Sequence, residues 1–371
     1  MTEFEKKLNE ELEKQIRETQ KPNLVVVGGT GVGKSSLINR IFGKQMAEVG
    51  NGQPITHGMN RYEWTSLVFF DTEGYELGTS NTPNKTNFDQ NIVPEILKMN
   101  KGELKDQIHL VWYCISISNH RVLDYDLQNI EFFVKHNMKT AVVFTQCDTD
   151  EELPSGEGKD ASEFRKIIQS RISSDIQCFE TCALNEKLEL DLPKLVDWSC
   201  ESLPNDQLRR SFVEAQKCSI SRKKKEAYLI VTTAVVTTAA TGGFNPIPLS
   251  DSLLIAPQQI VMCVSICRIF FGSVSGMLKE IITSQVLSLA GKTLAASLVK
   301  LIPGFGQIIN AAVAGTLTLA TGAAITEVNA KAYKEYLDTG KLPDWAQLLN
   351  SPMFMDMFKN VYNRKKWEEE K

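Results

Sequence analysis

A short glycine-rich segment near the amino terminus constrains the fold of this chain more than any other part of the sequence. Residues 28–35 read GGTGVGKS and match the pattern G-x-x-x-x-G-K-[ST] at every fixed position. The segment follows the apolar run 24–27, which is typical of a buried parallel strand, and precedes a helical pattern. Glycines here let backbone N–H groups close around a phosphate at the start of a helix. The segment therefore predicts a strand, a phosphate-binding loop and a helix in succession.

We expect this loop to bind the phosphates of a nucleotide together with Mg²⁺. Lys34 would neutralise the β- and γ-phosphate oxygens, and the hydroxyl of Ser35 would ligate the metal. The other candidate nucleotide-binding residues of this segment are Gly29, Thr30, Gly31, Val32, Gly33 and Ser36.

Three further positions are expected to complete the phosphate and metal site. Asp71 follows the apolar run 67–70, and a carboxylate at that strand end would hold Mg²⁺ through water. Gly74 ends the sequence Asp-Thr-Glu-Gly and would donate its N–H to the γ-phosphate. Thr56 lies in the polar segment 50–58, where its hydroxyl would contact Mg²⁺ and the γ-phosphate. The candidate catalytic residues are Lys34, Thr56 and Gly74, and the candidate metal ligands are Ser35, Thr56 and Asp71.

The choice of base depends on the segment 145–148, which reads TQCD at the end of an apolar run. The carboxylate of Asp148 can accept hydrogen bonds from N1–H and the N2 amino group of guanine, donors that adenine lacks. Cys182 and Ala183, at the end of the next predicted strand, would supply a backbone N–H to guanine O6. We therefore predict that the ligands are GTP and GDP. The candidate base-pocket residues are Thr145, Gln146, Asp148, Cys182 and Ala183.

Strand-like and helix-like patterns alternate around these motifs. Alternation of this kind predicts an α/β fold with a mostly parallel sheet covered by helices on both faces. The predicted strands are 24–27, 59–65, 67–70, 108–117, 140–145 and 176–182, and the predicted helices include 124–135, 162–172 and 192–200.

In their order and spacing, these elements resemble the P-loop small-GTPase superfamily, most closely the Era-like bacterial GTPases, over a G domain at residues 23–203. The family's base-recognition segment usually begins Asn-Lys, where this chain has Thr145 and Gln146. Septin-like and plastid-import GTPases show a similar threonine. Ras-like members carry a water-orienting glutamine where this chain has Tyr75, and potassium-activated members carry an asparagine where it has Gly31. The resemblance therefore implies slow GTP hydrolysis in isolation, stimulated by a GTPase-activating partner or by a homodimer.

The composition changes after residue 203. Only seven charged residues lie between positions 227 and 330, whereas 23% of the whole chain is charged. This predicts an all-α, apolar helical domain at residues 204–371. Residues 240–330 resemble the helical domain that follows some Era-like GTPase domains and occurs in YcjF-like membrane proteins. An amphipathic helix is expected at residues 1–22, packed against the domain that follows it.

Two uncharged stretches leave the relation to membranes open. Residues 227–250 and 301–326 are long enough to span a bilayer, although Thr, Gly, Pro and Gln dilute both. A packed helical core accounts for the same composition as well as membrane insertion or docking does. Likewise, the basic run 222–225 suits an anionic membrane surface or a solvated helix end.

Charge and cysteine content exclude several other classes of protein. The 41 Lys and Arg against 45 Asp and Glu give a net charge of −4, which argues against a general affinity for nucleic acid. The eight cysteines form no CxxC pair and predict free thiols in a reducing compartment. The first twenty residues lack the apolar core of a secretory signal. We therefore expect a cytoplasmic regulatory switch. The alternative is a nucleotide-controlled, membrane-associated scaffold whose helical domain does the work.

Overall fold

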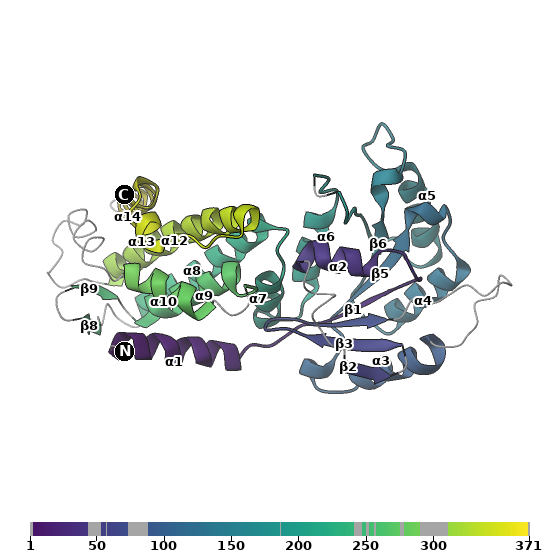
Figure 1. Ribbon diagram of the computed structural model, residues 1–371, viewed down its shortest axis with the longest axis horizontal. Helices are drawn as coiled ribbons and strands as arrows, with labels where there is room; N and C mark the ends of the chain where they lie inside the picture. Colours follow the sequence, from purple (N-terminus) through teal and green to yellow (C-terminus); the bar gives the residue numbers. More distant parts are fainter. Residues whose placement is uncertain are drawn as a thin grey trace. The chain divides into compact units, whose positions relative to one another are not determined.

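The computed structural model describes residues 3–43, 53–56, 58–72, 88–185, 187–240, 247–249, 252–255, 257–274, 278–289 and 311–369. Contacts within the chain divide it into two compact units. One unit contains Gln20–Ser219, and the other combines Met1–Thr19 with Ile220–Lys371. Figure 1 shows the helices and strands of both units, labelled where there is room.

A seven-stranded sheet organises the unit Gln20–Ser219, with the strand order β2-β3-β4-β1-β5-β6-β7. Strand β1 pairs in parallel with β4 and β5, and the parallel ladder continues through β6 to β7. Near one edge, β3 pairs antiparallel with both β2 and β4. The strands are β1 Asn23–Gly28, β2 Gln53–Thr56, β3 Met59–Glu63, β4 Val68–Thr72, β5 Leu110–Ser116, β6 Thr140–Thr145 and β7 Gln177–Glu180. This confirms the predicted mostly parallel sheet.

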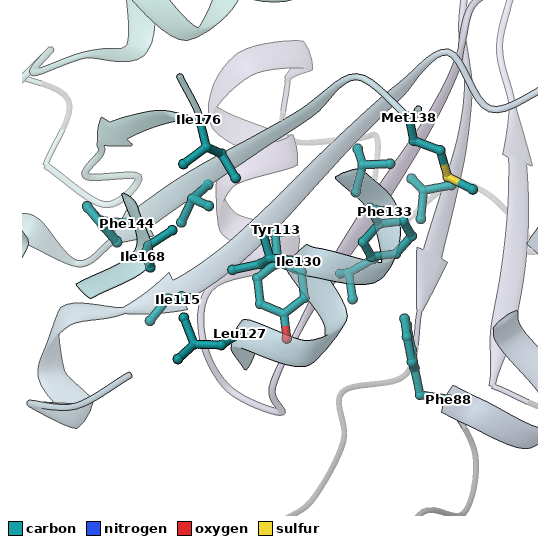
Figure 2. Close-up of a cluster of buried hydrophobic side chains, with 14 of the residues drawn as sticks. Phe88, Tyr113, Ile115, Leu127, Ile130, Phe133, Met138, Phe144, Ile168 and Ile176 are labelled. Atoms are coloured by element: carbon teal, nitrogen blue, oxygen red, sulfur yellow. The ribbon is translucent and has the colours of Figure 1, made fainter. Parts of the chain in front are cut away.

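Successive residues of a strand point to opposite faces of the sheet. Here helices cover both of these faces. On one face, Tyr113 of β5 lies in a buried cluster with Phe133 of α4 (Figure 2). On the other face, Trp112 stacks on Phe42 of α2 with ring centroids 5.9 Å apart, and its indole N–H donates to Ser199 of α6 at 3.1 Å. The helices are α2 Lys34–Phe42, α3 Val93–Asn100, α4 Asp124–Lys135, α5 Lys159–Arg171, α6 Leu192–Ser202 and α7 Asp206–Ala215.

Helix α7 groups with the sheet, and the division between the units falls after Ser219, whereas composition suggests a boundary at residue 203. Asn205 caps α7, since its side chain accepts a hydrogen bond from the N–H of Leu208. Phe212 of α7 then packs edge-to-face on Phe42 with ring centroids 5.7 Å apart. These contacts attach a polar helix to the sheet, which its composition alone does not reveal.

The second unit is largely helical. Its longest helix, α12, packs against α8, α9 and α14. Strands β8 Ile247–Leu249 and β9 Ser252–Ile255 form a two-stranded antiparallel ribbon that the sequence did not suggest. The helices are α1 Glu3–Arg17, α8 Ile220–Ala240, α9 Pro257–Phe271, α10 Leu278–Leu289, α12 Ala311–Thr339, α13 Trp345–Leu349 and α14 Pro352–Glu369.

The amino-terminal helix α1 belongs to this helical unit, where it contacts α9 and α10 (Figure 1). Its apolar face is covered there, because Leu8 and Leu12 are buried. Arg268 of α9 donates from Nη2 to the hydroxyl of Thr19 at 2.8 Å. The expected packing of this helix against the domain that follows it is therefore wrong. An amphipathic stripe predicts burial, but it does not predict which apolar surface covers it.

The basic run 222–225 is largely engaged within the helical unit. Lys223 is fully buried, and its Nζ donates to the carbonyl of Ile269 at 2.5 Å and lies 5.1 Å from the ring centroid of Tyr333. Lys224 pairs with Glu327 at 2.7 Å. A solvated helix end therefore does not describe this run. Within the described residues, no helix combines the length and hydropathy needed to cross a bilayer.

Candidate functional site

The glycine-rich loop connects β1 to α2 through three left-handed glycines. Gly28, Gly31 and Gly33 have φ values of 148°, 75° and 94°, a region that favours glycine. A Cβ on Gly28 would lie 2.3 Å from the carbonyl oxygen of Cys114 in β5. The loop therefore packs directly on the neighbouring strand. Gly33 is the residue before α2, so the first N–H groups of that helix face the loop.

The side chain of Lys34 lies along this loop. Its Nζ donates to the carbonyls of Gly28 and Gly29, both at 3.0 Å, and the residue is 9% exposed. Burial lowers the pKa of Lys34, while the nearby carboxylate of Asp71 raises it. An ammonium group held against the loop backbone is well placed to meet a phosphate that the same backbone binds.

Ser35 and Asp71 line the same small cavity of about 30 Å³, together with Ile38, Tyr62 and Phe69. The pairing of β1 with β4 aligns Asp71 with Val26, which brings the carboxylate close to the start of the loop. Burial and the charge of Asp71 raise the pKa of the Tyr62 phenol. Hydroxyl and carboxylate oxygens are ligands that Mg²⁺ prefers, so these two members of the predicted metal set fit the ion.

Of the other two predicted catalytic residues, the structure describes the backbone of Thr56 but not Gly74. Thr56 ends strand β2, where it is the register partner of Met59, so the polar segment expected around it is partly a strand. The sequence did not reveal β2 because its four residues carry no alternating apolar pattern. The side chain of Thr56, as well as Gly74 and Tyr75, lies outside the described residues.

The predicted base-recognition segment is bonded to the loop. The hydroxyl of Thr145 donates to the carbonyl of Val32 at 2.5 Å, although 113 positions separate the two residues. The N–H of Cys147 donates to the carbonyl of Thr181 at 3.1 Å, which brings the segment beside Cys182. Asp148 is exposed on the short turn Cys147–Thr149. The predicted phosphate loop and base segment therefore meet at the carboxyl edge of the sheet.

Sequence reasoning missed one polar partner at this edge. The hydroxyl of Ser116, at the end of β5, donates to Oε1 of Gln146 at 2.8 Å. Pairing of β5 with β6 sets Ser116 opposite Thr145, which positions the contact. A lone serine after an apolar strand carries no motif, so only the strand register could have identified it.

Thr145→Val is expected to lower the free energy of unfolding by about 1–3 kcal/mol, because the carbonyl of Val32 loses its hydroxyl donor in a buried position. Valine keeps the shape of threonine, and Thr145→Ser, which keeps the donor, is the matched control. Denaturant unfolding of both variants measures the difference. Equal stability of Thr145→Val and wild type would contradict a structural role for this bond.

Comparison with known proteins places this architecture among GTP-binding proteins. A family model described as 50S ribosome-binding GTPase matches residues 23–146. A probable GTP-binding protein EngB of Ligilactobacillus salivarius (strain UCC118) is 30% identical over 158 residues, covering 42% of this chain and 76% of that protein. The corresponding protein of Mycoplasma genitalium is 25% identical over 127 residues, covering 34% and 62%. A crystal structure of a probable GTP-binding protein engB aligns with 48% of this chain and 97% of its own, at 18% identity and a TM-score of 0.35.

Proposed function

This chain belongs to the family of GTP-binding proteins that includes EngB, and we propose that it acts as a regulatory switch that binds and slowly hydrolyses GTP. The observation that carries the proposal is the hydrogen bond from Thr145 to Val32, since it makes the phosphate loop and the base segment parts of one site. A ligand that spans both must offer phosphates at one end and a base at the other. Asp148 favours guanine as that base.

Each candidate residue has a separate task in this proposal. Lys34 neutralises phosphate charge at the loop, and Asp148 accepts from the N1–H and N2 amino groups of guanine. Backbone N–H groups near Cys182 and Ala183 receive guanine O6. Ser35 and Asp71 would hold Mg²⁺, with Thr56 as the third ligand in the GTP state. When bound, the metal supplies positive charge beside the β- and γ-phosphates.

The switch depends on segments that contact the γ-phosphate. In the GTP state Thr56 and Gly74 approach this group, and its loss on hydrolysis releases them. Because Tyr75 replaces the water-orienting glutamine of Ras-like enzymes, we propose that hydrolysis needs an activating partner or a second copy of the chain. The YcjF-like helical domain would then read which nucleotide is bound.

The second candidate function is a nucleotide-controlled scaffold on a membrane surface. It is favoured by the outer face of α8, where Leu229 and Val236 are 42% and 63% exposed. Two helical turns separate these residues, so they share one face. Flotation with anionic vesicles, in the presence of a GTP analogue and of GDP, tests this function. Protein that stays at the bottom of the gradient with both nucleotides would contradict it.

Asp148→Asn is expected to shift the base preference from guanine toward xanthine. The amide can donate to the xanthine O2, whereas it loses the charged acceptor for guanine N1–H. A charge-assisted hydrogen bond of about 1.5–3 kcal/mol predicts a loss of GDP affinity of about 10- to 150-fold. Competition of GDP and XDP against a fluorescent nucleotide measures the shift, with Asp175→Asn on the exposed surface as the control. Unchanged GDP affinity would remove the argument for guanine.

A further inference from the structure

Gln146 occupies an unusual position at the end of β6. Its backbone is left-handed, with φ at 60°, which is uncommon for a residue other than glycine. The turn Cys147–Thr149 begins directly after it. The conformation therefore ends the strand and redirects the chain toward Asp148.

The amide of Gln146 lies beside the phosphate loop. Its Nε2 is 4.0 Å from the place where a Cβ on Gly33 would stand, and the Thr145 hydroxyl is 3.8 Å from the same point. Gln146 also lies two residues before Asp148 in the chain. A nucleotide with its phosphates at the loop and its base at Asp148 must pass this amide with its ribose and the adjoining edge of the base.

Ser116 fixes the orientation of that amide. The serine is 3% exposed, and its hydroxyl donates to Oε1 of Gln146 at 2.8 Å. Since Oε1 is held by Ser116, the two N–H donors on Nε2 are directed away from the serine and remain on the side of the loop. The amide is uncharged, so it can offer an oriented hydrogen-bond donor but no net attraction for phosphate.

We propose that Ser116 is a positioning residue for nucleotide binding, which acts by holding the Gln146 amide as a neutral donor to the ribose and base of the ligand. The inference rests on the proposed function, because it assumes a guanine nucleotide in this site. In this proposal Gln146 contacts the nucleoside part of the ligand, and the loop 28–35 binds its phosphates. Loss of the contact therefore weakens GDP and GTP by the same factor.

The test is equilibrium binding of GDP and a non-hydrolysable GTP analogue to the full chain and its variants. Ser116→Ala is expected to weaken both nucleotides about 5-fold, which is the scale of one neutral hydrogen bond. Gln146→Ala removes the other partner of the Ser116–Gln146 hydrogen bond. It is expected to weaken the binding of both nucleotides by at least the same factor. Ser118→Ala is the matched control, because Ser118 is exposed on the turn Ile117–Asn119, and it should bind as wild type does.

A double variant separates positioning from a merely structural role. If Ser116 acts through Gln146, the pair Ser116→Ala and Gln146→Ala binds no more weakly than Gln146→Ala alone. Independent, additive losses would overturn the inference, as would wild-type affinity in Ser116→Ala. A loss confined to the GTP analogue would also overturn it, since that would assign the contact to the γ-phosphate. Failure of the wild-type chain to bind any guanine nucleotide would instead overturn the proposed function along with it.

Discussion

Lys34→Ala is expected to remove nucleotide binding by the full chain. The Lys34 ammonium lies against the carbonyls of Gly28 and Gly29 and is largely buried, so alanine removes the positive charge that would meet a phosphate at this loop. Truncating one partner of a buried charge pair costs about 2–5 kcal/mol, which corresponds to a loss of affinity of about 30- to several thousand-fold. Isothermal titration with GDP in the presence of Mg²⁺ measures the loss.

Lys194→Ala is the matched control for this experiment. Lys194 is also in the sheet unit and is paired with a carboxylate, Asp191, at 2.7 Å, but its side chain is 75% exposed. Exposed pairs of this kind contribute about 0–1 kcal/mol, so affinity and stability should both stay near wild type. Binding of GDP by Lys34→Ala at wild-type strength would show that the loop is not a phosphate site.

Gly28→Ala is expected to destabilise the sheet unit by about 2–6 kcal/mol. The methyl group would stand 2.3 Å from the carbonyl oxygen of Cys114, and the φ of 148° is strained for any residue with a side chain. Backbone strain and overpacking each cost about 1–3 kcal/mol, and here they act together. Strand β1 would have to separate from β5 to relieve the contact, which would move the loop.

Gly156→Ala measures the cost of backbone strain without the steric collision. Gly156 has a φ of 82° and nothing within 4 Å of a Cβ placed on it, so alanine there adds strain without a collision. It is expected to cost about 1–2 kcal/mol. Denaturant unfolding of both variants gives the comparison. Equal stability of Gly28→Ala and Gly156→Ala would contradict the close approach of the loop to β5.

The sequence predicts best those elements whose signal is local. The periodicity of residues 124–135 and the apolar run 140–145 predict α4 and β6 with the bounds that the structure has. The glycine pattern of residues 28–35 likewise predicts the loop between β1 and α2. In each case the pattern lies within one element, and its spacing matches the geometry that the element requires.

The features that sequence missed depend on contacts between distant segments. Strand β2 has no alternating pattern of its own and is defined by its pairing with β3. The sequence of helix α1 predicts an apolar face, but it does not predict that helices α9 and α10 cover this face. Ser116 becomes part of the candidate site only through the register of β5 and β6. Such contacts join residues far apart in the chain, so no local pattern encodes them.

The structure shows which hydrogen bonds Thr145 and Gln146 make at the positions where the family usually has Asn-Lys. Thr145 bonds to the carbonyl of Val32, and Gln146 is held by Ser116. Both side chains therefore have defined partners in this chain, and Asp148 keeps its place on the turn that follows. The hydrogen bonds of Thr145 and Gln146 therefore support the segment in place of those of Asn-Lys, while the carboxylate of Asp148 is kept.

The central claim is that the loop 28–35 and the segment 145–148 form one guanine-nucleotide site. Competition of GTP, GDP and ATP for a fluorescent GDP analogue, bound to the full chain with Mg²⁺, tests it most directly. GTP and GDP should displace the analogue, and ATP should do so at least about 100-fold less effectively, because adenine offers no donor pair to Asp148. Equal displacement by ATP and GTP, or no binding of the analogue at all, would contradict the claim.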